Sequence, residues 1–246
     1  MIDIHSHILP MVDDGAADVN TALEMLQKAS EYGTTDIVLT PHFAANRHYI
    51  NKSDKVTVLF SQLRDIKNYN HINIRLYPGT EYMMLGEEYY RKDKGHILTM
   101  NNTDYLLMEF PFNAGEDEII SGVNCILNDG LIPIIAHPER YHVIHIYPEL
   151  CGMLVREGAL FQMNKDSVSG GFGRQAEDTA LYLLRHRLYA FAGSDAHNLY
   201  NRNPVMTSAF DFVKEYCNSR YADMLFRHNP YYMLKNTDIR GFVNYP

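Results

Sequence analysis

Residues 2–7 read IDIHSH, a short apolar strand that ends in two histidines. Because alternate residues of a strand point to the same side, His5 and His7 can bind one metal ion together. The pattern recurs along the chain, where histidines and carboxylates stand mostly at the ends of predicted strands. The nine residues of this kind are His5, His7, Asp14, His42, Glu81, Glu109, His137, Asp195 and His197. Their placement favours a barrel enzyme with a multi-metal hydrolytic site at one edge.

The length and composition fit a globular domain of barrel size. The chain has 246 residues, of which 46% are hydrophobic and 21% are charged, and we expect a single domain over residues 1–246. No apolar run approaches the roughly 20 residues that a membrane helix needs, so we do not expect a membrane-embedded protein. Residues 1–5 already read as the first strand, and we therefore expect no signal peptide.

Charge and cysteine content limit the function further. The net charge of −8 argues against a nucleic-acid partner, which requires a basic face. An anionic substrate stays compatible with this charge, because bound divalent cations would reverse the local field. The three cysteines are odd in number and far apart, which predicts reduced thiols and a cytoplasmic location.

Short apolar strands alternate with amphipathic helices, without repeats or linkers. The strands are expected at residues 2–7, 37–40, 72–77, 105–109, 132–136, 160–164 and 189–193. The helices are expected at residues 19–32, 53–68, 118–128, 148–157, 175–186 and 204–216. This order predicts an α/β fold with a parallel sheet covered by helices. Longer loops are expected at residues 44–52 and 82–100, and residues 222–246 are expected to form a peripheral helix and tail.

An open, doubly wound sheet would show the same alternation of strands and helices. In an open sheet, however, the site gathers at one switch point, whereas here ligand-type residues follow nearly every strand. We therefore expect a closed or nearly closed barrel, in which the first and last strands are neighbours.

Each candidate ligand taken alone has an ordinary structural explanation. His42 and His137 could be structural histidines, and Asp14 could cap a tight turn. Glu81 and Glu109 each end an apolar strand, where a carboxylate must be paired with a cation or bound to a metal. The argument for a metal site therefore depends on the coincidence of many such residues at one end of the barrel.

The charge of the predicted site suits a phosphate ester. Nine ligands suit about three ions if one carboxylate bridges, and four carboxylates with three divalent ions leave a charge of about +2. That charge matches a phosphate dianion. Mixed imidazole and carboxylate ligands suit zinc, iron or manganese better than calcium.

Six motifs carry a resemblance to a known family, and together they are specific. They are MIDIHSHILPMVDDGA (1–16), TPHF (40–43), PGTE (78–81), EFPF (109–112), IAHPER (135–140) and SDAHN (194–198). In this order they resemble the PHP (polymerase and histidinol phosphatase) superfamily over residues 1 to about 202. More specifically, they resemble the manganese-dependent bacterial tyrosine-protein phosphatases of capsule and exopolysaccharide loci.

The resemblance implies a distorted (β/α)7 TIM-like barrel of PHP type with three divalent metal ions. Manganese is the ion it favours, with iron, zinc or magnesium as alternatives. The implied ligands are His5, His7, Glu81 and Asp195 for the first ion, bridging Glu81 with Glu109 and His137 for the second, and Asp14, His42 and His197 for the third. Many PHP relatives have histidine where this chain has Asp14 and Glu109, and the acidic residues fit the tyrosine phosphatase branch.

Two arginines match positions that hold phosphate in this family. Arg140 closes the HPER motif and Arg202 follows the last predicted ligand, although surface salt bridges would be an alternative role. The third-ion ligands, Asp14, His42 and His197, are expected to stabilise the leaving oxygen of the substrate. A cysteine mechanism is disfavoured, because no cysteine of this chain begins a C-x5-R motif.

The resemblance implies hydrolysis of phosphotyrosine on proteins, in the cytoplasm. The implied partner is a membrane-associated tyrosine autokinase that regulates polysaccharide synthesis or export. One alternative is a phosphatase of a small phosphomonoester such as histidinol phosphate. Another is a metal-stabilised scaffold without turnover, which a complete ligand set disfavours, and the acidic charge disfavours a nuclease.

Overall fold

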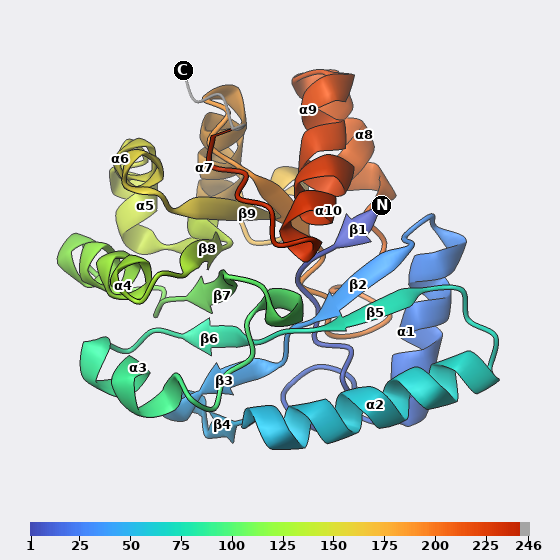
Figure 1. The fold of residues 1–246 in the computed structure, drawn as a ribbon. Helices are drawn as coiled ribbons and strands as arrows, with labels where there is room; N and C mark the ends of the chain where they lie inside the picture. Colours follow the sequence, from blue (N-terminus) through green and yellow to red (C-terminus); the bar gives the residue numbers. More distant parts are fainter. Residues whose placement is uncertain (242–246) are drawn as a thin grey trace.

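The computed structural model describes residues 1–241, in which parallel strands form the wall of a barrel (Figure 1). The strands are β1 (Ile2–Asp3), β2 (Asp36–Leu39), β3 (His42–Ala44), β4 (Tyr49–Ile50), β5 (Arg75–Pro78), β6 (Glu81–Met83), β7 (Tyr105–Glu109), β8 (Ile132–Ala136), β9 (Leu160–Asn164) and β10 (Phe191–Gly193). One sheet has the order β1-β2-β5 and the other β10-β9-β8-β7-β6-β3-β4. Every pair is parallel except β3 with β4.

Two of the predicted strands are followed by a second short strand that belongs to the other sheet. Pro41 separates β2 from β3, and proline has no amide hydrogen with which to continue the first ladder. Gly79 lies between β5 and β6, where a Cβ atom would stand only 3.0 Å from the side chain of Val38. These breaks carry the chain across to the second sheet, where His42 and Glu81 are paired in register.

The extension of β1 closes the barrel. Ser6 forms a parallel bridge with Ala196, and the amide of His7 donates to the carbonyl of Ala196 at 2.9 Å. On its other side, the carbonyl of Ser6 accepts from the amide of Thr40 at 2.9 Å. The prediction that the first and last strand segments are neighbours is confirmed, and the fold is a distorted α/β barrel.

Helices cover the outside of this wall. They are α1 (Val19–Glu31), α2 (Ser53–Tyr69), α3 (Glu87–Asp93), α4 (Glu116–Asn128), α5 (His142–Ile146), α6 (Leu150–Glu157), α7 (Arg174–Arg185), α8 (Thr207–Tyr216), α9 (Ser219–Asp223) and α10 (Asn229–Leu234). The side chain of Asp18 accepts from the amide of Thr21 at 2.7 Å and caps α1, as predicted. Buried apolar side chains of α1 and α2 form one core with those of β2. Among residues 1–241, no helix is both long and apolar enough to cross a membrane.

Three segments differ from their prediction. Residues 44–52 are not an irregular loop, because β4 pairs with β3 and a 3₁₀ helix (Ala45–Arg47) joins them. Residues 82–100 contain most of β6 and all of α3. The segment after residue 222 is not peripheral, since a π-helical turn (Met224–His228) and α10 bury apolar side chains against the barrel. The last five residues, 242–246, lie outside the part that the structure describes.

Apolar burial explains the position of the C-terminal segment. Leu225, Phe226 and Met233 are fully buried, and Met233 belongs to the same cluster as Ile2 and Phe191. Because burial of each such side chain contributes about 1.5–3 kcal/mol, the segment is held in place as part of the core.

Candidate metal centre

All nine predicted metal ligands lie close together at one end of the barrel. We call their side chains the ligand cluster: His5, His7, Asp14, His42, Glu81, Glu109, His137, Asp195 and His197. They are buried, except that the side chain of Asp14 is 49% exposed. They come from the extension of β1 and its following turn, the starts of β3 and β6, the end of β7, and the segments after β8 and β10. The curvature of the wall therefore brings residues distant in sequence to one place.

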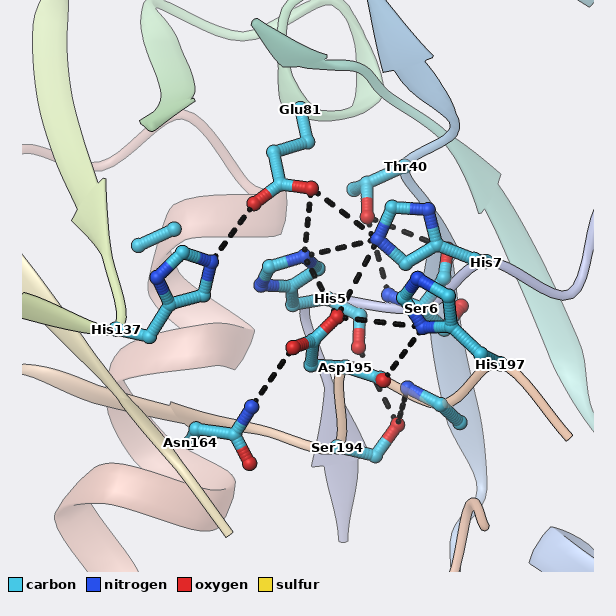
Figure 2. Close-up of polar contacts among 12 residues, drawn as sticks. His5, Ser6, His7, Thr40, Glu81, His137, Asn164, Ser194, Asp195 and His197 are labelled. Atoms are coloured by element: carbon cyan, nitrogen blue, oxygen red, sulfur yellow. Dashed lines mark hydrogen bonds and ion pairs between the residues drawn. The ribbon is translucent and has the colours of Figure 1, made fainter. Parts of the chain in front are cut away.

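Four side chains converge at the centre of the cluster (Figure 2). The Nε2 atoms of His5 and His7 are 3.2 Å apart, and each lies 3.2 Å from Oε2 of Glu81. Oδ1 of Asp195 lies 3.6 Å from Nε2 of His5 and 3.4 Å from Nε2 of His7. Two imidazoles and two carboxylates thus aim their lone pairs at one small volume, as the ligands of a divalent ion do.

Glu81 links this centre to a second group. Its Oε1 lies 3.1 Å from Nε2 of His137, while its Oε2 lies 3.0 Å from Nδ1 of His42. The same Nδ1 of His42 is 3.2 Å from Oε1 of Glu109. The two oxygens of Glu81 therefore face different sets of partners, which is the arrangement that a bridging carboxylate requires.

A third group lies on the far side of His7. Oδ1 of Asp14 is 3.4 Å from Nε2 of His197 and 3.5 Å from Nε2 of His42. The ring of His7 is 4.0 Å from that of His197. His42 faces both the second and the third group, so its assignment to one ion stays a prediction.

Buried polar atoms without a hydrogen bond test whether the cluster fits a metal centre. Nδ1 of His42, Oε2 of Glu81, Oε1 of Glu109, Nδ1 of His137 and Nε2 of His197 are buried and make no hydrogen bond within the described residues. All of them except Nδ1 of His137 lie within ion-pair distance of another residue of the cluster. Buried polar atoms are nearly always paired, because an unpaired one costs about 1–3 kcal/mol. Three groups of His, Asp and Glu residues in this cluster have ligand atoms within 4.8 Å of one another. The donor set therefore fits divalent cations.

Hydrogen bonds on the side facing away from the cluster centre fix the orientation of two predicted ligands, His5 and Asp195. Nδ1 of His5 lies 2.8 Å from Oε1 of Gln162, so its Nε2 points into the cluster. Oδ2 of Asp195 accepts from Nδ2 of Asn164 at 2.8 Å. Both supporting residues, Gln162 and Asn164, lie on β9, and sequence reasoning missed them. Polar residues at alternate positions of an otherwise apolar strand were the available signal.

Asp13 has a supporting role that the sequence analysis did not assign. Its Oδ2 lies 2.8 Å from Nδ1 of His7 and accepts from the amide of His42 at 2.9 Å. Its Oδ1 accepts from the amide of Gly15 at 3.0 Å. Of the two adjacent aspartates in the turn, one thus orients ligands from behind while Asp14 faces the cluster itself.

Backbone strain accompanies two of the predicted ligands. His137 has φ of 35° and Asp195 has φ of 50°, both in the left-handed region that residues other than glycine avoid. Such a conformation costs on the order of 1 kcal/mol and persists where the surrounding structure fixes it. It turns each side chain toward the cluster directly after a strand.

The electrostatics of the cluster favour added positive charge. Burial opposes protonation of His42, but the Glu81 and Glu109 carboxylates together outweigh it and raise the pKa of His42 to about 9. Burial also opposes protonation of His7, yet the Asp13 carboxylate holds the pKa of His7 well above its usual value. Conversely, His5 and His42 outweigh burial and hold the pKa of Glu81 well below its usual value. The lowered pKa of Glu81 keeps its carboxylate ionised, and it attracts cations, either protons or metal ions.

Three arginines stand beside the cluster. Nη1 of Arg140 lies 3.3 Å and Nη2 of Arg202 lies 2.5 Å from Oδ2 of Asp195. Their side chains are 18% and 28% exposed, so both reach the cluster and solvent. Nη1 of Arg47, which sequence reasoning missed, lies 3.4 Å from Oε1 of Glu109. Its only sequence signal was a position in the segment that follows His42.

The cysteines are unsuited to nucleophilic catalysis. Burial raises the pKa of the Cys125, Cys151 and Cys217 thiols, so each stays protonated near neutral pH. This agrees with the lack of a C-x5-R motif.

Comparisons with known proteins agree on one family. Residues 1–235 match the family model described as capsular polysaccharide synthesis, CpsB/CapC. The chain is 36% identical to tyrosine-protein phosphatase YwqE of Bacillus subtilis strain 168 over 97% of this chain and 93% of that protein. It is 31% identical to tyrosine-protein phosphatase CpsB of Streptococcus pneumoniae over 94% and 96%, respectively. This chain superposes with a TM-score of 0.89 on a chain from crystal structures described as those of YwqE from Bacillus subtilis and CpsB from Streptococcus pneumoniae, unique metal-dependent tyrosine phosphatases. The two chains are 35% identical, and the match covers 96% of this chain and 95% of that chain.

Proposed function

Because this chain belongs to the CpsB/CapC family of capsular polysaccharide synthesis proteins, we propose that it is a metal-dependent protein-tyrosine phosphatase. The observation that carries the proposal is the ligand cluster, with its buried donor atoms that make no hydrogen bond within the described residues and the two arginines on Asp195. The names of the relatives supply the reaction class, and the donor set supports the metal dependence.

The cluster would hold three divalent ions, with manganese first and iron, zinc or magnesium as alternatives. His5, His7, Glu81 and Asp195 would hold one ion, Glu81, Glu109 and His137 the second, and Asp14, His42 and His197 the third. Such ions supply Lewis-acid stabilisation of phosphoryl oxygens and lower the pKa of water to near neutrality. Four carboxylates oppose this charge, which leaves the centre attractive to a phosphate dianion.

The protein's own residues bind and orient the phosphoryl group. Arg140 and Arg202 present planar, permanently charged N–H donors that match phosphate oxygens in pairs. Asp14, His42 and His197 lie together beside the ring of His7, where they would stabilise the leaving oxygen. A tyrosine phenolate has a conjugate acid with a pKa near 10, so it needs less acid assistance than an alkoxide does.

The substrate is phosphotyrosine on a protein, and the partner that fits the family description is a membrane-associated tyrosine autokinase of polysaccharide synthesis or export. We place the reaction in the cytoplasm, in keeping with the three free thiols.

The test is phosphate release from a phosphotyrosyl peptide and from histidinol phosphate by chelator-stripped protein restored with Mn²⁺. We expect turnover of the peptide only with metal, and a loss of about 100-fold or more in Arg140→Ala and His137→Ala. Arg64→Ala is the matched control, because Arg64 is 49% exposed on α2 and contacts Asp65 and the ring of Phe60, neither of which belongs to the ligand cluster. Turnover of histidinol phosphate alone would move the assignment to a small phosphomonoester, and turnover of neither would refute the proposal.

A further inference from the structure

The guanidinium of Arg140 lies between two phenylalanine rings. Its Cζ atom is 4.5 Å from the ring centroid of Phe112 and 4.2 Å from that of Phe172. Both distances are well inside the roughly 6 Å at which a cation is attracted to the face of an aromatic ring. We call Phe112 and Phe172 the aromatic pair.

The two rings come from separate segments that are each held firmly. The carbonyl of Phe112 accepts from the amide of His142 at 2.9 Å, and its ring packs at 6.1 Å on that of the ligand His137. Phe172 lies in a tight turn in which the amide of Gly171 donates to the carbonyl of Asp166 at 2.9 Å. A Cβ atom on Gly171 would stand 3.0 Å from the Cβ and carbonyl oxygen of Asp166, so the turn is tightly packed at this position.

Neither ring is fully buried. Phe112 is 38% exposed and Phe172 is partly buried, although both lie beside a charged cluster rather than in an apolar core. Besides the guanidinium of Arg140, the ring of Phe112 contacts the rings of His137 and Tyr141, whose centroids lie 6.1 and 6.2 Å away.

We infer that the aromatic pair positions Arg140 for the phosphoryl group. Rings against the guanidinium leave its N–H donors available at the edge, where Nη1 already reaches Oδ2 of Asp195. The remaining donors are then directed beside Asp195 in one plane, which suits paired contacts to phosphate oxygens. An arginine without the rings would sample many rotamers, and fixing it would cost binding energy.

This inference rests on the proposed function, but its test does not require turnover. The first readout is the equilibrium affinity of Mn²⁺-loaded protein for inorganic phosphate, measured by calorimetry. The second is the division between kcat and KM on a phosphotyrosyl peptide. The variants are Phe112→Leu, Phe172→Leu and the double substitution, each in the native and in the Arg140→Ala background.

We expect each leucine variant to weaken phosphate binding by about three- to thirty-fold, the range of a cation–π contact. In the Arg140→Ala background the same substitutions should change the affinity by less than about two-fold, because the rings would act only through the arginine. Phe172→Tyr keeps an aromatic face and should retain the native affinity. Phe212→Leu, on α8, is the matched control and should leave the affinity unchanged.

Equal losses in the presence and absence of Arg140 would overturn the inference, since the rings would then contact the ligand directly or support the fold. Failure of the metal-loaded protein to bind phosphate at all would overturn it as well. If the peptide is not turned over but phosphate binding shows the expected coupling, the proposed function fails while the role of the aromatic pair stands.

Discussion

Nδ1 of His7 lies 2.8 Å from Oδ2 of Asp13, while Nε2 of the same ring lies 3.2 Å from Oε2 of Glu81. One imidazole thus connects a supporting carboxylate to the centre of the ligand cluster. The carboxylate fixes which nitrogen faces the cluster and makes that nitrogen a stronger donor to a cation. The amides of His42 and Gly15 hold Asp13 in turn, so the 13–15 turn and the start of β3 are tied to one ligand.

Asp13→Asn should weaken the affinity for Mn²⁺ by about 10- to 100-fold, the usual effect of removing a carboxylate behind a histidine ligand. The amide keeps the shape of the side chain but removes the charge that favours the correct orientation of His7. Isothermal titration of stripped protein measures the dissociation constant. Asp65→Asn is the control, because the side chain of Asp65 is 71% exposed. An unchanged dissociation constant in Asp13→Asn would contradict this role.

Glu139→Gln should lower the free energy of unfolding by about 1–3 kcal/mol. Glu139 is fully buried and accepts from the amide of Asn164 at 2.8 Å, from Oγ of Ser167 at 2.7 Å and from Oη of Tyr189 at 2.8 Å. Glutamine would place an NH₂ group against one of these donors. Urea unfolding measures the change, and the exposed Glu157→Gln should stay within about 0.5 kcal/mol. Equal losses in both variants would refute this explanation.

Most of the predicted ligands were accessible to sequence reasoning because they stand at the ends of predicted strands, and their coincidence carried the argument. A histidine or carboxylate directly after an apolar run, as in His137 or Glu109, marks a strand end, and parallel strands bring their ends to one edge. The breaks after β2 and β5 were marked by Pro41 and Gly79, but nothing local indicates that the chain resumes in a second sheet. The ligand roles themselves stay predictions.

Other features depend on contacts between distant segments. Phe172 is one residue of a glycine-rich turn, and only the folded chain brings it to Arg140. The C-terminal segment looked peripheral because it follows the last strand. Its apolar residues are buried because they pack against Ile2 and Phe191 on strands of the barrel. Long-range packing of this kind leaves no periodic signal in the sequence.

The stability of chelator-treated protein should fall as the pH rises from about 6.5 to about 9. The pKa of His42 is near 6.5 in an unfolded chain and is raised to about 9 in the fold, where the Glu81 and Glu109 carboxylates together outweigh burial. A raised pKa means that the fold binds the proton more tightly. The contribution of protonated His42 to the free energy of unfolding is therefore complete below pH 6.5 and is lost as the pH rises through about 9.

Urea unfolding in chelator at pH 6.5 and pH 9 measures this dependence. His42→Asn should make this dependence shallower and leave the part that the raised pKa values of His5 and His7 contribute, whereas His186→Asn, at an exposed position, should not change it. Stability that rises over this interval in the native protein would show that the histidine is not held in its protonated form.

Arg47→Ala should tighten Mn²⁺ binding by about two- to five-fold, as expected from the loss of an ion pair that solvent partly screens. Nη1 of Arg47 lies 3.4 Å from Oε1 of Glu109 and 3.5 Å from Nε2 of His42, so the guanidinium competes with a cation for the same two side chains. Its side chain is 34% exposed, which limits the effect. Calorimetric titration with Mn²⁺ measures the change, with Arg64→Ala as the control. Weaker binding in Arg47→Ala would mean that the arginine supports the ligands instead of competing with the ion.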